Sequence, residues 1–65
     1  MLQTYKGFEY IVEDDVDYDV VKKWHYAYDT ATDRSYDLRW SPYSYLPREE
    51  FERQVDQIID RMVHS

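Results

Sequence analysis

The chain has 65 residues, no cysteine, one glycine and a net charge of −6. A chain of this length buries only about 60% of the surface that it exposes when unfolded. The length therefore predicts one domain, residues 1–65, with little interior for a catalytic cleft. The absence of cysteine excludes disulfides and thiolate metal sites. Aromatic residues make up 18% of the chain, which indicates a folded protein and not a disordered one.

The negative charge and the lack of known motifs narrow the function classes. Direct binding to nucleic acid or to an anionic membrane is not expected, because both favour a basic surface. No segment approaches the roughly 20 apolar residues of a membrane span, and the first residues do not predict a signal peptide. The sequence contains no phosphate-binding glycine loop, nucleophile elbow or zinc pattern. We therefore expect a cytoplasmic protein that is not an enzyme, with no catalytic residue, metal site or cofactor.

The first forty residues alternate with a period of two, which predicts half-buried strands. The nine positions that carry this pattern are all even-numbered: Phe8, Tyr10, Val12, Trp24, Tyr26, Tyr28, Tyr36, Leu38 and Trp40. Residues directly opposite each other in an antiparallel pair share a face, so connecting loops with odd numbers of residues are expected. We predict loops at 14–18 and 30–34. The resulting register places Tyr10 opposite Lys22, Val12 opposite Val20, Trp24 opposite Trp40, Tyr26 opposite Leu38 and Tyr28 opposite Tyr36.

The last third of the chain changes to helical spacing. The apolar residues that predict one helix face are Phe51, Val55, Ile58, Ile59 and Met62. Pro47 suits the first helical position, where its missing N–H has no cost. Leu46 is placed to pack against the first helical turns.

These elements predict an α+β fold of the order β-β-β-α. A three-stranded antiparallel meander packs one face against the C-terminal helix. The other sheet face is expected to meet water or a partner, and it would carry Glu9, Ile11, Lys23, His25, Ala27, Ser35, Asp37 and Arg39. On this arrangement His25 is an exposed strand histidine, while Tyr43 and Tyr45 are expected to cover the end of the core.

An acidic stretch lies at residues 13–19, and three interpretations of it remain open. It is a solvated loop whose aspartates favour turns, a cation site, or an electronegative recognition edge for a basic protein. Asp15, Asp17 and Asp19 match the first half of a calcium-binding loop. However, Val20 and Tyr26 stand where that loop requires glycine and glutamate.

The segment from Trp40 to Tyr43, followed by the helix opening Pro47 to Phe51, resembles short uncharacterised open reading frames of phages and mobile elements. This resemblance assigns no functional residue. It implies a small acidic protein that binds and inhibits a host protein, in some cases by imitating DNA. For a phage-encoded chain the expected location is the host cytoplasm.

The leading hypothesis is a non-enzymatic module that binds a basic protein surface, with nucleic-acid-binding proteins among the candidate partners. The expected binding residues are Glu13, Asp14, Asp15, Asp17, Tyr18 and Asp19. The alternative is a structural or assembly protein that forms homo-oligomers through the open sheet face, around Ile11, Val21, His25 and Ala27.

Overall fold

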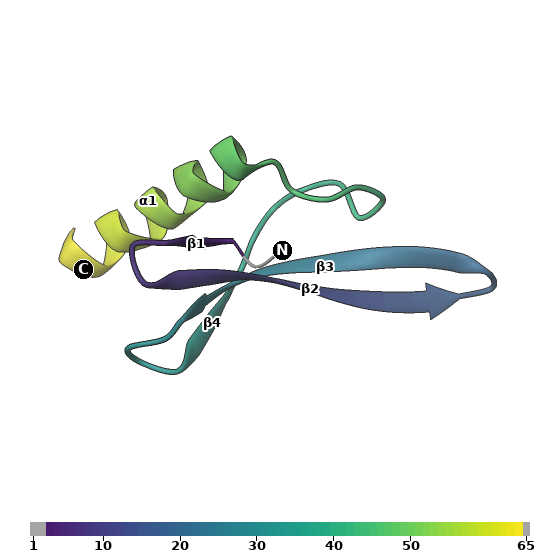
Figure 1. The fold of residues 1–65 in the computed structure, drawn as a ribbon, viewed down its shortest axis with the longest axis horizontal. Coiled ribbons are helices and arrows are strands. Elements are labelled where there is room, and N and C mark those ends of the chain that lie inside the picture. Colours follow the sequence, from purple (N-terminus) through teal and green to yellow (C-terminus); the bar gives the residue numbers. More distant parts are fainter. Residues whose placement is uncertain (1–2, 65) are drawn as a thin grey trace.

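The computed structural model describes residues 3–64 as four strands and one helix. In chain order these are β1 (Thr4–Tyr5), β2 (Phe8–Asp17), β3 (Val20–Asp29), β4 (Arg34–Asp37) and α1 (Arg48–His64). The strands form one antiparallel sheet in the order β1-β2-β3-β4. Helix α1 lies over one end of the sheet, and the β2–β3 hairpin runs on well beyond it (Figure 1). The predicted α+β class is confirmed, whereas the predicted number of strands was one too few.

The additional strand, which the alternating pattern does not predict, is β1, which has only two residues. A two-residue turn of Lys6 and Gly7 joins it to β2, and both residues have positive φ angles, 51° and 83°. This is the requirement of a type I′ turn, and glycine meets it without steric cost. Contacts with α1 hold β1 in place: Arg48 Nη2 donates to the carbonyl oxygen of Thr4 at 2.9 Å, and Lys6 Nζ lies 2.9 Å from Asp56 Oδ1.

The predicted loop lengths were wrong at both of the other connections. Strands β2 and β3 are joined by two residues, Tyr18 and Asp19, with φ angles of 49° and 65°. Strands β3 and β4 are joined by residues 30–33, and Asp33 there has a φ of 58°. Both loops have even numbers of residues, so even-numbered positions lie opposite odd-numbered ones.

This change of parity moves Trp24, Tyr26 and Tyr28, which were predicted to face the helix, to the open face of the sheet. Tyr10 lies opposite Ala27, not Lys22, and Tyr26 lies opposite Asp37, not Leu38. The side chains of β3 that face the helix are therefore odd-numbered. The corrections cover every predicted pair in the hairpin and in β3–β4: Tyr10 with Lys22, Val12 with Val20, Trp24 with Trp40, Tyr26 with Leu38 and Tyr28 with Tyr36.

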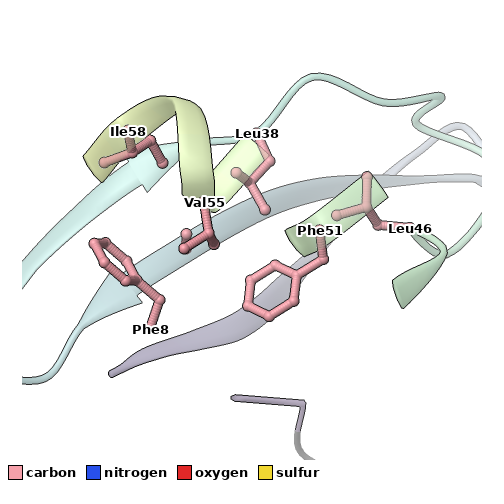
Figure 2. Packing of buried hydrophobic residues seen from close by; sticks show 7 residues of the cluster. Phe8, Leu38, Leu46, Phe51, Val55 and Ile58 are labelled. Carbon is pink, nitrogen blue, oxygen red and sulfur yellow. The ribbon is translucent and has the colours of Figure 1, made fainter. Parts of the chain in front are cut away.

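The core lies between the helix and the near end of the sheet. Its buried apolar residues are Phe8, Ala27, Leu38, Leu46, Phe51, Val55 and Ile58 (Figure 2). The predicted helix face is confirmed at Phe51, Val55 and Ile58, and Leu46 packs in the core as expected. Met62, by contrast, is 46% exposed.

His25 and Ala27 were expected on the open face and are instead buried on the helix side. The Tyr10 hydroxyl accepts a hydrogen bond from the Leu46 N–H at 3.0 Å. It also lies 2.7 Å from His25 Nδ1, and His25 Nε2 lies 3.0 Å from the Ser41 carbonyl oxygen. Because that carbonyl can only accept, Nε2 carries a proton, and in the neutral imidazole Nδ1 then accepts from the Tyr10 hydroxyl. Burial raises the pKa of Tyr10 above its ordinary value, which keeps the hydroxyl protonated.

This network anchors the connection between β4 and α1 to the sheet. The same connection also pairs with β3 through its backbone: Leu38 N–H donates to the His25 carbonyl at 2.8 Å, and Lys23 N–H donates to the Pro42 carbonyl at 2.7 Å. The Gln54 side chain holds it from the helix by hydrogen bonds to both backbone groups of Arg39, at 2.9 and 2.7 Å. Among residues 3–64, no helix has the length and apolar content of a membrane span.

Candidate functional site: the hairpin arm

The far half of the β2–β3 hairpin projects from the body of the molecule, and residues 13–22 are called the hairpin arm below (Figure 1). Residues 13–21 are exposed without interruption although all but the two turn residues are in regular strands. The radius of gyration is 12.5 Å, compared with about 11 Å for a compact chain of this length. The arm therefore has backbone order without a core of its own.

Two features of the sequence build the arm. Valines 16, 20 and 21 favour extended backbone because they are β-branched. The type I′ turn at Tyr18 and Asp19 matches the right-handed twist of the two strands. The turn also carries Tyr18 at the extreme tip, where its side chain is 92% exposed.

The register divides the predicted binding residues between two faces and the tip. Glu13, Asp15 and Asp17 occupy alternate positions of β2 and lie on the face away from the helix. Side chains at such alternate positions are about 6.6–6.8 Å apart. Asp14 lies on the helix side, whereas Tyr18 and Asp19 form the turn. The structure thus forms the carboxylate row with three acids and separates the other members of the predicted set from it.

The two lysines of β3 lie directly opposite acids of β2. Lys22 pairs in register with Asp15, and Lys23 with Asp14. Lys23 Nζ lies 3.2 Å from Asp14 Oδ1, and this contact is the first cause of the raised pKa of Lys23. Within residues 13–22, five acids and one lysine give a net charge of −4, two thirds of the −6 of the whole chain.

Apolar side chains are also exposed on the arm. Val16 and Val21 are opposite each other on the helix side, beyond the reach of the helix, and are 65% and 43% exposed. Val20 lies on the other face and is 44% exposed. Exposed apolar groups bordered by charge are typical of surfaces that bind other proteins.

The aromatic residues of β3 continue the arm along the open sheet face. Trp24 is 49% exposed, and Tyr26 and Tyr28 are half-buried. Trp24 and Tyr26 border a hollow of about 430 Å³ that Asp37 of β4 also lines. Partial burial, with the nearby carboxylates of Glu13 and Asp37, raises the pKa of Tyr26.

Tyr43 and Tyr45 do not cover the core as expected, because they are 65% and 67% exposed. The Tyr45 ring contacts the ammonium group of Lys23, which is 4.6 Å from the ring centroid. This cation–π contact joins the connection between β4 and α1 to the base of the arm.

The calcium-loop interpretation does not match the backbone, because Asp15 and Asp17 are in a strand and only Asp19 is in the turn. Within residues 3–64, no group of three or more histidine or acidic side chains is arranged to hold a metal ion.

The exposed aromatic residues of β3, Trp24, Tyr26 and Tyr28, were predicted to lie in the core and are instead part of the candidate site. One signal could have found them. Pairing Asp14 with Lys23 and Asp15 with Lys22 satisfies opposite charges across the hairpin, and it fixes the observed register. That register places Trp24 and Tyr26 on the open face.

Comparison with protein-family models, with curated proteins and with solved structures found no match to this chain. Its function is therefore inferred from its own residues and their geometry.

Proposed function

We propose that this chain is a small non-enzymatic module that binds a basic protein surface through the hairpin arm. The observation that carries the proposal is the unbroken exposure of residues 13–21 within the hairpin arm, residues 13–22, whose net charge is −4. A two-stranded ribbon without a packed face is marginally stable by itself. Its like charges add repulsion. A basic partner would relieve the repulsion and cover the exposed valines.

The arrangement of side chains supports a protein as the partner. Glu13, Asp15 and Asp17 offer a row of carboxylates for lysine and arginine side chains. Tyr18 offers an aromatic anchor at the tip, and tyrosine is enriched at protein interfaces. A nucleic acid would be repelled by the same charges.

Inhibition of a nucleic-acid-binding protein is the sharper form of this proposal. A protein surface that receives phosphates is basic, and a row of carboxylates can occupy it in place of DNA. The single row formed by Glu13, Asp15 and Asp17 supports contact with one stripe of such a surface.

The proposal is tested with two charge-matched variants. The arm variant carries Asp15→Asn, Asp17→Asn and Asp19→Asn, and the control carries Glu49→Gln, Glu52→Gln and Asp60→Asn on the helix. Binding of a fluorescent oligolysine peptide is measured by anisotropy at low and high salt. We expect the wild type and the control to bind in a salt-dependent manner and the arm variant to lose binding. Equal weakening by both variants would show that only overall charge matters.

A second candidate function is self-association through the open sheet face. The observation that favours it is the half-exposed Trp24 beside the hollow that Tyr26 and Asp37 line. Val21, His25 and Ala27 do not contribute to this face, because the register places them on the helix side. Sedimentation of the wild type and Trp24→Ala tests the candidate. A dimer that resists salt and is lost in the variant would support it, and a monomer at all concentrations would contradict it.

A further inference from the structure

The outer edge of β2 has backbone groups that face away from the sheet. Tyr10 N–H points to the β1 side, since it donates to the Gln3 carbonyl at 2.9 Å. Because backbone groups alternate in direction along a strand, those of Val12, Asp14 and Val16 point the same way. The pairing of β1 with β2 ends at Thr4 and Glu9. Within residues 3–64, no strand follows along this edge beyond Tyr10.

The outer edge of β3 is paired over a greater part of its length than the outer edge of β2. On β3 the odd-numbered residues point outward, and β4 pairs with them up to Ala27. The connection after β4 then bonds to the backbone of His25 and Lys23. In the described part of the chain, the longest unpaired strand edge is thus the outer edge of β2 from Val12 to Asp17.

Proteins protect such edges from pairing with another strand by proline, bulges, charged side chains or very short strands, and of these devices this edge has only the charged side chains. Here β2 has ten residues, no proline, and ten consecutive register pairs with β3 without a bulge. The charge of the β2 side chains therefore determines which kind of strand can pair with this edge.

The charges disfavour pairing with a second copy of the same strand. An antiparallel pair of two β2 edges centred on Asp14 would place Asp14 opposite Asp14 and Glu13 opposite Asp15. Like charges directly opposite each other destabilise a strand pair. A strand with lysine or arginine at these positions would instead form favourable pairs.

We propose that an extended lysine- or arginine-rich segment of a partner protein adds to the outer edge of β2 as an antiparallel strand. The inference rests on the proposed function and adds the mode of binding. Basic residues of the segment lie opposite Glu13, Asp15 and Asp17 on the open face. On the helix side, apolar residues lie opposite Val12 and Val16, and a basic residue lies opposite Asp14. The order expected from the amino end of the segment is basic, apolar, basic, basic, basic, apolar.

The probe is the capped hexapeptide Lys-Val-Lys-Lys-Lys-Val in three forms. One is unmodified, one is N-methylated at the fourth residue, and one is N-methylated at the third. In the proposed register the fourth residue lies opposite Asp14, and its N–H points to β2, whereas the N–H of the third points away. The two methylated peptides have the same charge and composition. They differ only in which side of the added strand is blocked.

Affinities for the full chain are measured by titration calorimetry. We expect N-methylation at the fourth residue to weaken binding by about tenfold or more, because it removes a hydrogen bond and introduces a clash. Methylation at the third residue should change the affinity by less than about threefold, since it touches no bond to β2. Equal affinities of all three peptides would overturn strand addition while leaving charge-driven binding intact. Failure of every peptide to bind, together with failure of oligolysine, would instead contradict the proposed function.

Amide hydrogen exchange gives an independent readout on the protein side. In the free chain the amides of Asp14 and Val16 should exchange faster than those of Glu13 and Asp15, which bond to β3. The unmodified peptide should slow hydrogen exchange at the amides of Asp14 and Val16 selectively. Uniform slowing along the arm, or none, would contradict pairing at this edge.

Discussion

The body of the molecule and the hairpin arm share two strands but depend on different interactions. At the body end of the hairpin, Phe8 and Ala27 are buried beneath the helix, and even His25 has partners for both ring nitrogens. In the arm the same strands continue with regular pairing, yet both faces are open. The burial that stabilises the domain is therefore concentrated in the body, and the arm contributes little of it.

The largest expected effect that separates the two regions is at Phe51. This side chain is fully buried, and its ring centroid lies 5.6 Å from that of Tyr10. Phe51→Ala should lower the free energy of unfolding by about 3–5 kcal/mol. This loss is a large share of the stability of a small domain. Urea unfolding followed by circular dichroism measures it. A loss below about 1 kcal/mol would show that the helix contributes little to the body.

The next effect concerns the network under the connection between β4 and α1. Tyr10→Phe removes a hydroxyl and leaves His25 Nδ1 and the Leu46 N–H without their partner. We expect a loss of about 1–3 kcal/mol in the free energy of unfolding. Tyr18→Phe at the exposed tip is the matched control and should leave stability unchanged. Equal results for the two variants would contradict a structural role for the network.

A smaller effect is expected at Glu50 and depends on pH. Hydrogen bonds from Arg53, and then Gln54, lower the pKa of Glu50 in the folded chain. The unfolded chain binds the proton more readily, so the stabilisation is present above the unfolded pKa of about 4.3 and is lost as pH falls through the folded value. Such helix pairs contribute about 0.2–0.5 kcal/mol. The free energies of unfolding of the wild type and of Glu50→Gln, measured from pH 7 to pH 3, should become equal at the acid end of this range.

The smallest expected effect on stability is in the arm. Val16→Thr with Val21→Thr should change the free energy of unfolding by less than about 0.5 kcal/mol, because both side chains are already exposed. The same double variant should weaken binding of the hexapeptide, because Val16 lies opposite the second residue of the peptide, a valine, in the proposed register. Thermal unfolding and calorimetry check the two parts. A large drop in melting temperature would mean that the arm supports the body.

The sequence predicted the body better than the arm for identifiable reasons. The spacing of Phe51, Val55 and Ile58 signals one helix face directly, because the 3.6-residue period needs no partner to be recognised. Strand positions have a period of two, so a loop that is one residue longer or shorter reverses the face. The turn at Tyr18 and Asp19 lacks the Asn-Gly or Asp-Gly signal of a two-residue hairpin. The even-numbered apolar pattern instead predicted a longer loop with an odd number of residues, and this placed β3 with the wrong face inward.

The candidate site was predicted in part. The acidic residues were identified from charge alone, and they all lie in the arm. Their division into a row of three, one acid on the helix side and one in the turn depends on the register, which the sequence did not reveal. The burial of His25 was not predictable from its neighbours, because its partners Ser41 and Tyr10 are 16 and 15 residues away.

The turn at the tip of the arm has a consequence for engineering. The left-handed backbone conformation costs a residue other than glycine roughly 1–2 kcal/mol of stability. Both Tyr18 and Asp19 adopt this conformation. Replacing the pair by Asn-Gly would relieve that strain without altering either strand. The tip is thus a place where the rigidity of the hairpin can be raised, although the same replacement removes the tyrosine side chain and one negative charge.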